Sequence, residues 1–234
     1  MKAADILRRL NRFHDLLLLI GFILLMLISN YCVLDSYYVY THTVNEDILR
    51  FKPTAEGYDP DKSPISKDMV AWLTLDDTSI DQPVMQSEEP GKYLNTDPFG
   101  NYSLSGSLFL DSENSPDFSD DYSIIYGHHM QYGKMFGALD DFLDEDYLKT
   151  HHTGELIIGR NAERIYGLEV FAAAKLSAKE KMIFSVSETS DTDEFIYKNA
   201  DICIGEARGR IVALSTCAES SSDMRIVVFC YIVE

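Results

Sequence analysis

Cysteine is scarce in this sequence, which has four in 234 residues: Cys32, Cys203, Cys217 and Cys230. Cys32 falls in a long apolar run, and Cys203 and Cys230 have apolar neighbours, where a cysteine acts as a small buried hydrophobe. Four cysteines placed in this way exclude a dense disulfide framework. Cys217 is left as a free thiol that is available for chemistry.

Basic residues are also in short supply. Lysine and arginine together number 20 against 38 aspartates and glutamates, which gives a formal net charge of -18. Nucleic-acid phosphates and anionic lipid headgroups repel so acidic a chain, and this disfavours a nucleic-acid partner. The charge serves to keep an exposed domain soluble. The sequence shows no internal repeat, nucleotide-binding loop or haem motif.

Recognisable metal-binding spacings are absent. The two histidine pairs, His128–His129 and His151–His152, lack the cysteines or carboxylates that complete a known type of site. The acidic residues Asp117, Asp120 and Asp121 are best interpreted as a solvated loop. We therefore expect neither a metal ion nor a cofactor.

Only one apolar run is long enough to cross a membrane. Leu16–Leu34 carries no charge and, as a helix, spans a hydrocarbon core of about 30 Å. Arg8, Arg9 and Arg12 precede it and Asp35 follows, which predicts a cytoplasmic N-terminus and an extracellular remainder. A cleaved signal peptide is the alternative, but no small-x-small site follows the run. We expect an uncleaved single-pass anchor in the cell membrane.

The rest of the chain divides by composition. Prolines and a glycine interrupt the segment after the anchor repeatedly, and only 44–51 has the pattern of a short helix. The expected parts are a basic cytoplasmic tail at 1–15, the anchor at 16–34, an extracellular tether at 35–65 and a globular domain at 66–234.

Short strands dominate the globular domain. Helical spacing is limited to 134–147 and 193–203, and Pro83 places its strand at a sheet edge. The expected strands are 70–75, 79–85, 105–111, 122–128, 154–160, 164–176, 210–217 and 225–233. This pattern predicts a mainly β fold, either a closed barrel or a sandwich.

The last two expected strands carry reactive side chains at facing ends. Cys217 ends one strand, and Arg225 opens the next after a polar loop. If the strands pair antiparallel, the two residues face each other. A fixed cation favours the thiolate of a cysteine and can donate hydrogen bonds to an oxyanion.

A histidine completes the set. His128 and His129 end another apolar strand, and imidazole can take a proton from a thiol and return it to a leaving amine. Taken singly, these residues also fit a core cysteine and a solvated arginine. Together they form a nucleophilic site.

The joint pattern resembles the sortase family. Leu214–Cys217 (LSTC) followed by Arg225 is similar to the family's cysteine signature, and Tyr126–Met130 (YGHHM) is similar to its histidine motif. Residues 69–111 and 133–144 resemble class B sortases, which have a tryptophan in the first strand, a Pro-Val turn and a Tyr-Leu pair. The resemblance extends over the globular domain.

This resemblance implies a closed eight-stranded barrel with a few peripheral helices, together with roles for particular residues. Cys217 would be the nucleophile, His128 the general acid and base, and Arg225 the cation at the oxyanion or substrate. The family's histidine directly follows a glycine, which favours His128 over His129. The implied substrate-binding residues are Thr216, Ser215, Tyr93 and Leu94.

The implied reaction is transpeptidation. The thiol would cleave a C-terminal sorting motif (LPxTG- or NPxTN-like) after threonine, and a peptidoglycan-precursor amine would resolve the thioester. Three alternatives stay open: a pilin lysine as the acceptor, simple hydrolysis, and a non-catalytic membrane-tethered binding domain. Glu88–Gly91 departs from the Asp-Asn pair of many class B members and leaves the substrate preference open.

Overall fold

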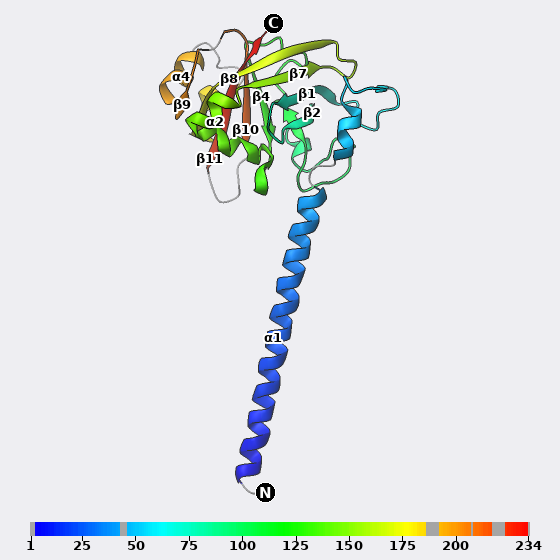
Figure 1. Ribbon diagram of the computed structural model, residues 1–234, viewed down its shortest axis with the longest axis vertical. Helices are drawn as coiled ribbons and strands as arrows, with labels where there is room; N and C mark the ends of the chain where they lie inside the picture. Colours follow the sequence, from blue (N-terminus) through cyan, green and yellow to red (C-terminus); the bar gives the residue numbers. More distant parts are fainter. Residues whose placement is uncertain (1–2, 43–45, 186–191, 207, 217–222, 234) are drawn as a thin grey trace. The chain divides into compact units, whose positions relative to one another are not determined.

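The chain contains two compact units, Met1–Asn45 and Glu46–Glu234. The computed structural model describes residues 3–42, 46–185, 192–206, 208–216 and 223–233. The first unit consists of helix α1 (Ala3–His42; Figure 1). Its segment Asp5–Tyr37 is long and apolar enough to cross a membrane, and this segment includes the expected anchor.

The second unit is a closed β-barrel with a few helices around it (Figure 1). Its strands are β1 (Met69–Leu75), β2 (Asp81–Met85), β3 (Leu108–Leu110), β4 (Tyr122–Gly127), β7 (Thr153–Ile158), β8 (Arg164–Ser177), β10 (Ile211–Thr216) and β11 (Met224–Val233). They follow one another in the order β11-β10-β4-β3-β2-β1-β7-β8, and pairing of β11 with β8 closes the ring. The mainly β, closed eight-stranded barrel is thus confirmed.

Strand β2 departs from its expected place. The prediction that Pro83 lies at a sheet edge is wrong, because β2 pairs with β1 on one side and with β3 on the other. The parallel pairing with β3 involves only Val84 and Met85. Pro83 therefore never has to donate a ladder hydrogen bond to β3, and the proline is tolerated inside the sheet.

The segment expected to be one helix at 134–147 is broken into several elements. These are β5 (His129–Met130), η3 (Gln131–Gly133), β6 (Lys134–Met135), the 3-10 helix η4 (Phe136–Leu143) and α2 (Glu145–Thr150). A Cβ on Gly137 would lie 1.9 Å from the Met130 carbonyl oxygen, so η4 starts pressed against β5. The Asp144 carboxylate accepts a hydrogen bond from Tyr147 N and caps α2 as a new helix.

The second expected helix is shorter than predicted. It forms α4 (Thr192–Asn199), and Ile202–Cys203 instead form β9, which pairs with β8 outside the ring. Cys203 is exposed there, with Sγ 3.2 Å from the Gly205 carbonyl oxygen. The prediction of a buried Cys203 is wrong because its side chain is exposed, while its neighbours Ile202 and Ile204 pack against the core. Cys230 is fully buried, as expected.

Side chains of β10 alternate between two apolar clusters. Val212 and Leu214 belong to the larger cluster. Ile211 and Ala213 belong to the other, which includes Ile183 and Ile196. These last two come from α3 (Lys181–Phe184) and α4, so helices cover the outer face of β10. Ile211–Leu214 thus follow the two-residue period of a β-strand.

The segment before β1 packs against the barrel. η1 (Glu46–Phe51) contributes Ile48 to a third apolar cluster with Ile65, Trp72 and Tyr93. Residues 46–65, which the sequence placed in a tether, therefore form part of the second compact unit.

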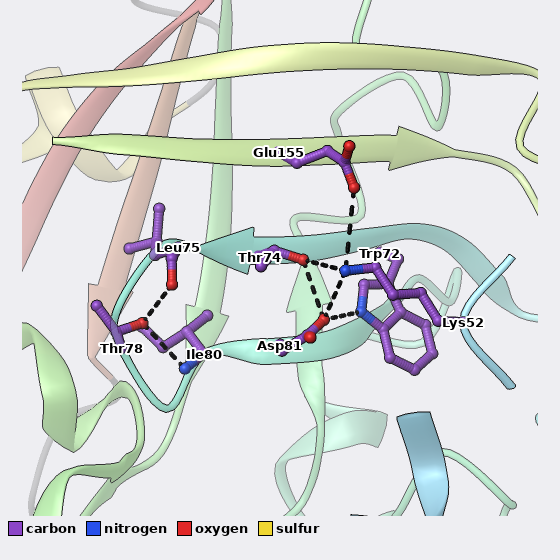
Figure 2. A network of polar contacts seen from close by, with 8 residues as sticks. All are labelled: Lys52, Trp72, Thr74, Leu75, Thr78, Ile80, Asp81 and Glu155. Atoms are coloured by element: carbon purple, nitrogen blue, oxygen red, sulfur yellow. Dashed lines mark hydrogen bonds and ion pairs between the residues drawn. The ribbon is translucent and has the colours of Figure 1, made fainter. Parts of the chain in front are cut away.

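A polar network fixes the same segment (Figure 2). Lys52 Nζ lies 2.8 Å from Thr74 Oγ1 and 3.0 Å from Asp81 Oδ1. Asp81 Oδ1 also accepts hydrogen bonds from Trp72 Nε1 at 2.6 Å and Thr74 Oγ1 at 3.0 Å. Glu155 on β7 adds a longer ion pair to Lys52 at 3.9 Å. The network ties η1 to β1, β2 and β7.

Candidate active site

A pocket of about 460 Å³ opens beside the end of β4. The loop 87–95 forms one wall, and Phe109 and Tyr126, with ring centroids 5.5 Å apart, form part of another. Four of the predicted site residues line the pocket: Tyr93, Leu94, His128 and Arg225. Cys217, the predicted nucleophile, lies outside the described residues.

The barrel brings the two predicted catalytic motifs together. β4 and β10 pair in parallel, with Ser215 opposite Tyr126 and Thr216 opposite Gly127. His128 directly follows Gly127, so it leaves β4 where β10 ends. Parallel neighbours that end at the same level present their next residues at one edge of the sheet.

Gly127 is required by close packing at this edge. A Cβ there would lie 2.5 Å from Leu108 Cδ2 and 2.8 Å from Phe136 Cδ2. Because real Cβ contacts are not this short, a larger residue would force Leu108 or Phe136 to shift. Close packing against Leu108 and Phe136 thus explains the glycine of the histidine motif.

The two neighbouring histidines have different partners. His128 Nε2 lies 2.7 Å from the Leu94 carbonyl oxygen, and the ring is half-buried at the pocket. His129 Nε2 lies 2.8 Å and 3.0 Å from the two carboxylate oxygens of Asp140. Of the pair, His128 is the one that lines the pocket.

Arg225 enters the pocket from β11. β10 and β11 pair antiparallel with Ser215 opposite Val227. Arg225 NH1 lies 3.4 Å from the Thr216 carbonyl oxygen, and its guanidinium carbon lies 5.3 Å from the centre of the Phe184 ring. Its buried Nε has no hydrogen-bond partner within the described part of the chain. A buried donor of this kind is suited to an incoming oxygen acceptor.

The hydroxyls of Thr216 and Ser215 are used within the strands. Thr216 Oγ1 accepts a hydrogen bond from Ile226 N at 3.0 Å, and Ser215 Oγ donates to the Thr216 carbonyl at 3.1 Å. Both residues are buried, and neither lines the pocket. Their nearest connection to the site is through the pairing of β10 with β4 and β11.

Tyr93 and Leu94 contribute to the pocket in different ways. The Tyr93 hydroxyl donates to Asp68 Oδ2 at 2.7 Å, and burial raises the pKa of this phenol. Leu94 presents its carbonyl to His128. Two residues were not predicted from the sequence: Asp68, which binds Tyr93, and Tyr126, which lines the pocket. The alternation of strand side chains would have placed Tyr126 on the same face as His128.

The acidic residues after β3 form a structured loop. Asp120 Oδ2 accepts hydrogen bonds from Asn114 Nδ2 at 3.0 Å and Ser115 N at 2.6 Å. Across the described ranges, no cluster of three or more histidine, cysteine or acidic side chains is arranged to hold a metal ion.

Comparison with known proteins gives a consistent result. The family model described as a sortase domain matches residues 73–233. Sortase B of Listeria monocytogenes is 34% identical over 164 residues, which cover 67% of this chain and 65% of the relative. Sortase B of Staphylococcus aureus is 32% identical over 180 residues, or 73% of this chain and 72% of the relative. The chain thus spans just under two thirds of the Listeria protein.

Solved structures show the same similarity. A Streptococcus pyogenes class B sortase involved in pilus biogenesis superposes with a TM-score of 0.65 at 33% identity, covering 71% of this chain and 92% of that one. The Staphylococcus aureus sortase B–substrate complex superposes with a TM-score of 0.64 at 30% identity, covering 73% and 82%. The barrel and the sequence similarity lead to one assignment: this chain belongs to the sortase family and resembles its class B members.

Proposed function

We propose that this protein is a class B-type cysteine transpeptidase with Cys217, His128 and Arg225 as its catalytic residues. The pairing of Thr216 with Gly127 is the observation that carries the proposal. Cys217 is bonded to Thr216 and His128 to Gly127, and consecutive Cα atoms are about 3.8 Å apart. We infer from this connectivity that the thiol and the imidazole can approach each other.

The chemistry follows from these three side chains. The Cys217 thiolate attacks the threonine carbonyl of a sorting motif, and the Arg225 guanidinium stabilises the oxyanion that forms. His128 gives its proton to the departing amine as the C–N bond breaks. The resulting thioester is attacked by an acceptor amine, which forms a new amide and releases the thiol.

The substrates are inferred from relatives. One related structure is a substrate complex of Staphylococcus aureus sortase B, and another is a sortase B complex with triglycine. We infer a surface protein with a C-terminal sorting motif as the acyl donor and a peptidoglycan-precursor amine as the acceptor. A pilin lysine is the second candidate acceptor, because the Streptococcus pyogenes relative is involved in pilus biogenesis.

The N-terminal helix supports a location for this reaction at the cell surface. Arg8, Arg9 and Arg12 precede the apolar part of α1, and the positive end of such a helix stays in the cytoplasm. The barrel would then face outward from a single-pass anchor at 16–34.

Peptide cleavage by the full chain in detergent micelles tests the proposal. LPxTG- and NPxTN-type peptides are supplied with triglycine or a lysine-bearing pilin peptide, beside Cys217→Ala, and mass spectrometry follows the products. We expect cleavage after threonine and an enzyme-bound thioester, both absent from the variant. The joined product identifies the acceptor, and release of free acid alone would favour a hydrolase. A Cys217 that neither cleaves peptides nor reacts with iodoacetamide would leave a non-catalytic binding domain.

A further inference from the structure

The contact between His128 and Leu94 also determines which ring nitrogen carries the proton. A carbonyl oxygen has no proton, so the 2.7 Å contact requires His128 Nε2 to be the donor. In the neutral ring the lone pair then lies on Nδ1. The contact therefore selects the tautomer whose Nδ1 can accept a proton from a thiol.

The Leu94 carbonyl is held by the two residues before it. Lys92 Nζ and the Tyr93 hydroxyl each lie 2.7 Å from Asp68 Oδ2. Lys92, Tyr93 and Leu94 together form the single turn η2 (Lys92–Leu94). The two hydrogen bonds lower the pKa of Asp68, with Lys92 the larger cause, so the carboxylate stays ionised at neutral pH.

Asp68 is itself fixed to the barrel. It directly precedes β1, its carbonyl accepts a hydrogen bond from Gln86 N at 2.9 Å, and its own N–H donates to Ser66 Oγ at 3.3 Å. A turn tied to this carboxylate therefore keeps a constant position relative to β1 and β2.

The carbonyl groups of the turn pack against a glycine. A Cβ on Gly106 would lie 2.4 Å from the Tyr93 carbonyl oxygen and 2.5 Å from that of Leu94. The Tyr93 carbonyl also accepts a hydrogen bond from Ser107 N at 2.9 Å. Asp68 holds two side chains of the turn and Gly106 contacts its carbonyls, so the Leu94 carbonyl has little freedom to move.

We propose that Asp68 is a positioning residue for catalysis, which holds the Leu94 carbonyl through Lys92 and Tyr93 and so sets the ring orientation and tautomer of His128. This inference rests on the proposed role of His128 as general acid and base. Asp68 is not among the residues that line the pocket, and its effect passes through the main chain of η2. A carboxylate with a purely structural role would change stability and leave the histidine tautomer unaltered.

The first test measures the tautomer directly. The full chain, labelled with 15N-histidine in micelles, is compared with Asp68→Ala, and a His128→Asn variant assigns the signal. We expect neutral His128 to be protonated on Nε2 in the wild type and to become a mixture of tautomers in Asp68→Ala. Asp59→Ala is the matched control, because it removes another aspartate paired with a lysine at 2.7 Å. It should leave the His128 signal unchanged.

The second test separates kcat from KM in the peptide assay. A displacement of the ring by about 1 Å is expected to lower kcat on the order of 10²-fold, with KM little changed. Asp68→Asn keeps an oxygen acceptor for Tyr93 and should recover part of the loss. Tyr93→Phe removes one hydroxyl and provides a milder variant if Asp68→Ala does not fold.

The outcomes separate this inference from the proposed function. An active wild type whose tautomer and kcat are the same in every folded Asp68 and Tyr93 variant would overturn the positioning role alone. An inactive wild type would overturn the proposed function, and the tautomer spectra would still show whether Asp68 controls His128. A changed tautomer together with a lowered kcat supports both.

Discussion

At the scale of single residues, Arg225 is the clearest case of a side chain with a buried donor that no described residue uses. Its NH1 contacts the Thr216 carbonyl, and its guanidinium carbon lies over the Phe184 ring. The buried Nε is left without an acceptor among the described residues. A lysine would reproduce the charge of Arg225 but not this donor.

Arg225→Lys should therefore be almost as damaging as Arg225→Ala. We expect kcat to fall by about 10²–10³-fold in both, because losing one oxyanion donor has that effect in other enzymes. Steady-state peptide cleavage measures it, with Arg164→Lys on the exposed start of β8 as the control. Activity of Arg225→Lys within a few fold of wild type would show that positive charge alone is sufficient.

The remaining thiols should differ sharply in reactivity. Burial raises the pKa of the Cys230 thiol far above its ordinary value, so almost no thiolate forms at pH 8, whereas Cys203 is exposed. In a Cys217→Ala background, maleimide should label Cys203 in the native chain and Cys230 only after denaturation. Peptide mass spectrometry assigns the label. Equal labelling rates in the native chain would contradict the buried position of Cys230.

Some of these residues could be predicted from the sequence, and others could not. His128 and Arg225 could be named because strand ends and local motifs identify them. The bond from His128 to Leu94 joins residues 34 positions apart, and no periodic pattern predicts such a contact. The exposure of Cys203 depends on β9 pairing outside the ring, which is likewise decided by tertiary structure.

At the scale of elements, local sequence predicted most strands, and the errors arose where a neighbouring element decides the structure. Alternation of apolar residues predicted most strands, because a side chain's face depends only on its place in the strand. The errors arose where the partner decides: Pro83 fits inside the sheet because β3 pairs only beyond it. The 3-10 helix η4 begins where Gly137 meets the Met130 carbonyl, which local sequence does not encode.

Gly127→Ala should disturb both the barrel and the site. The added Cβ would meet Leu108 and Phe136 at 2.5 Å and 2.8 Å, and overpacking of this kind costs about 1–3 kcal/mol. We expect a lower midpoint of urea unfolding and a lower kcat, since His128 follows directly. Gly167→Ala on β8 is the matched control, where the nearest atom, Val233 Cβ, is 3.4 Å away. Equal stability of the two variants would contradict tight packing at Gly127.

At the scale of the whole molecule, the folded unit extends further toward the N-terminus than the sequence suggested. The predicted boundary at Ser66 excludes Ile48, Ile65 and Lys52, all of which contact the barrel. The compact unit begins at Glu46. Prolines and a glycine marked this segment as a tether, yet a chain without regular strands can still pack closely.

Two truncations should therefore behave differently. A chain starting at Glu46 should unfold at the same temperature as the full chain's barrel. A chain starting at Ser66 loses two buried isoleucines, each worth about 1.5–3 kcal/mol, and about 1 kcal/mol corresponds to roughly 2–4 °C in a domain of this size. We expect a drop of roughly 6–24 °C by calorimetry. Lys52→Met in the chain that starts at Glu46 measures how much of the drop comes from the polar network. Equal unfolding temperatures for the two truncated chains would support a boundary at Ser66.

The parallel pairing of β4 with β10 also has a consequence for the timing of activity. Strands β7 and β8 lie between β4 and β10 in the chain. The histidine and cysteine motifs therefore meet only after the chain has returned from β8 to pair β10 with β4. Arg225 arrives with β11, whose pairing to β8 closes the ring. Under the proposed mechanism, a chain that is still unfolded therefore carries an unactivated thiol. If acyl transfer needs all three side chains, as proposed, it begins only when the barrel is complete, and an unfinished enzyme leaves sorting motifs intact.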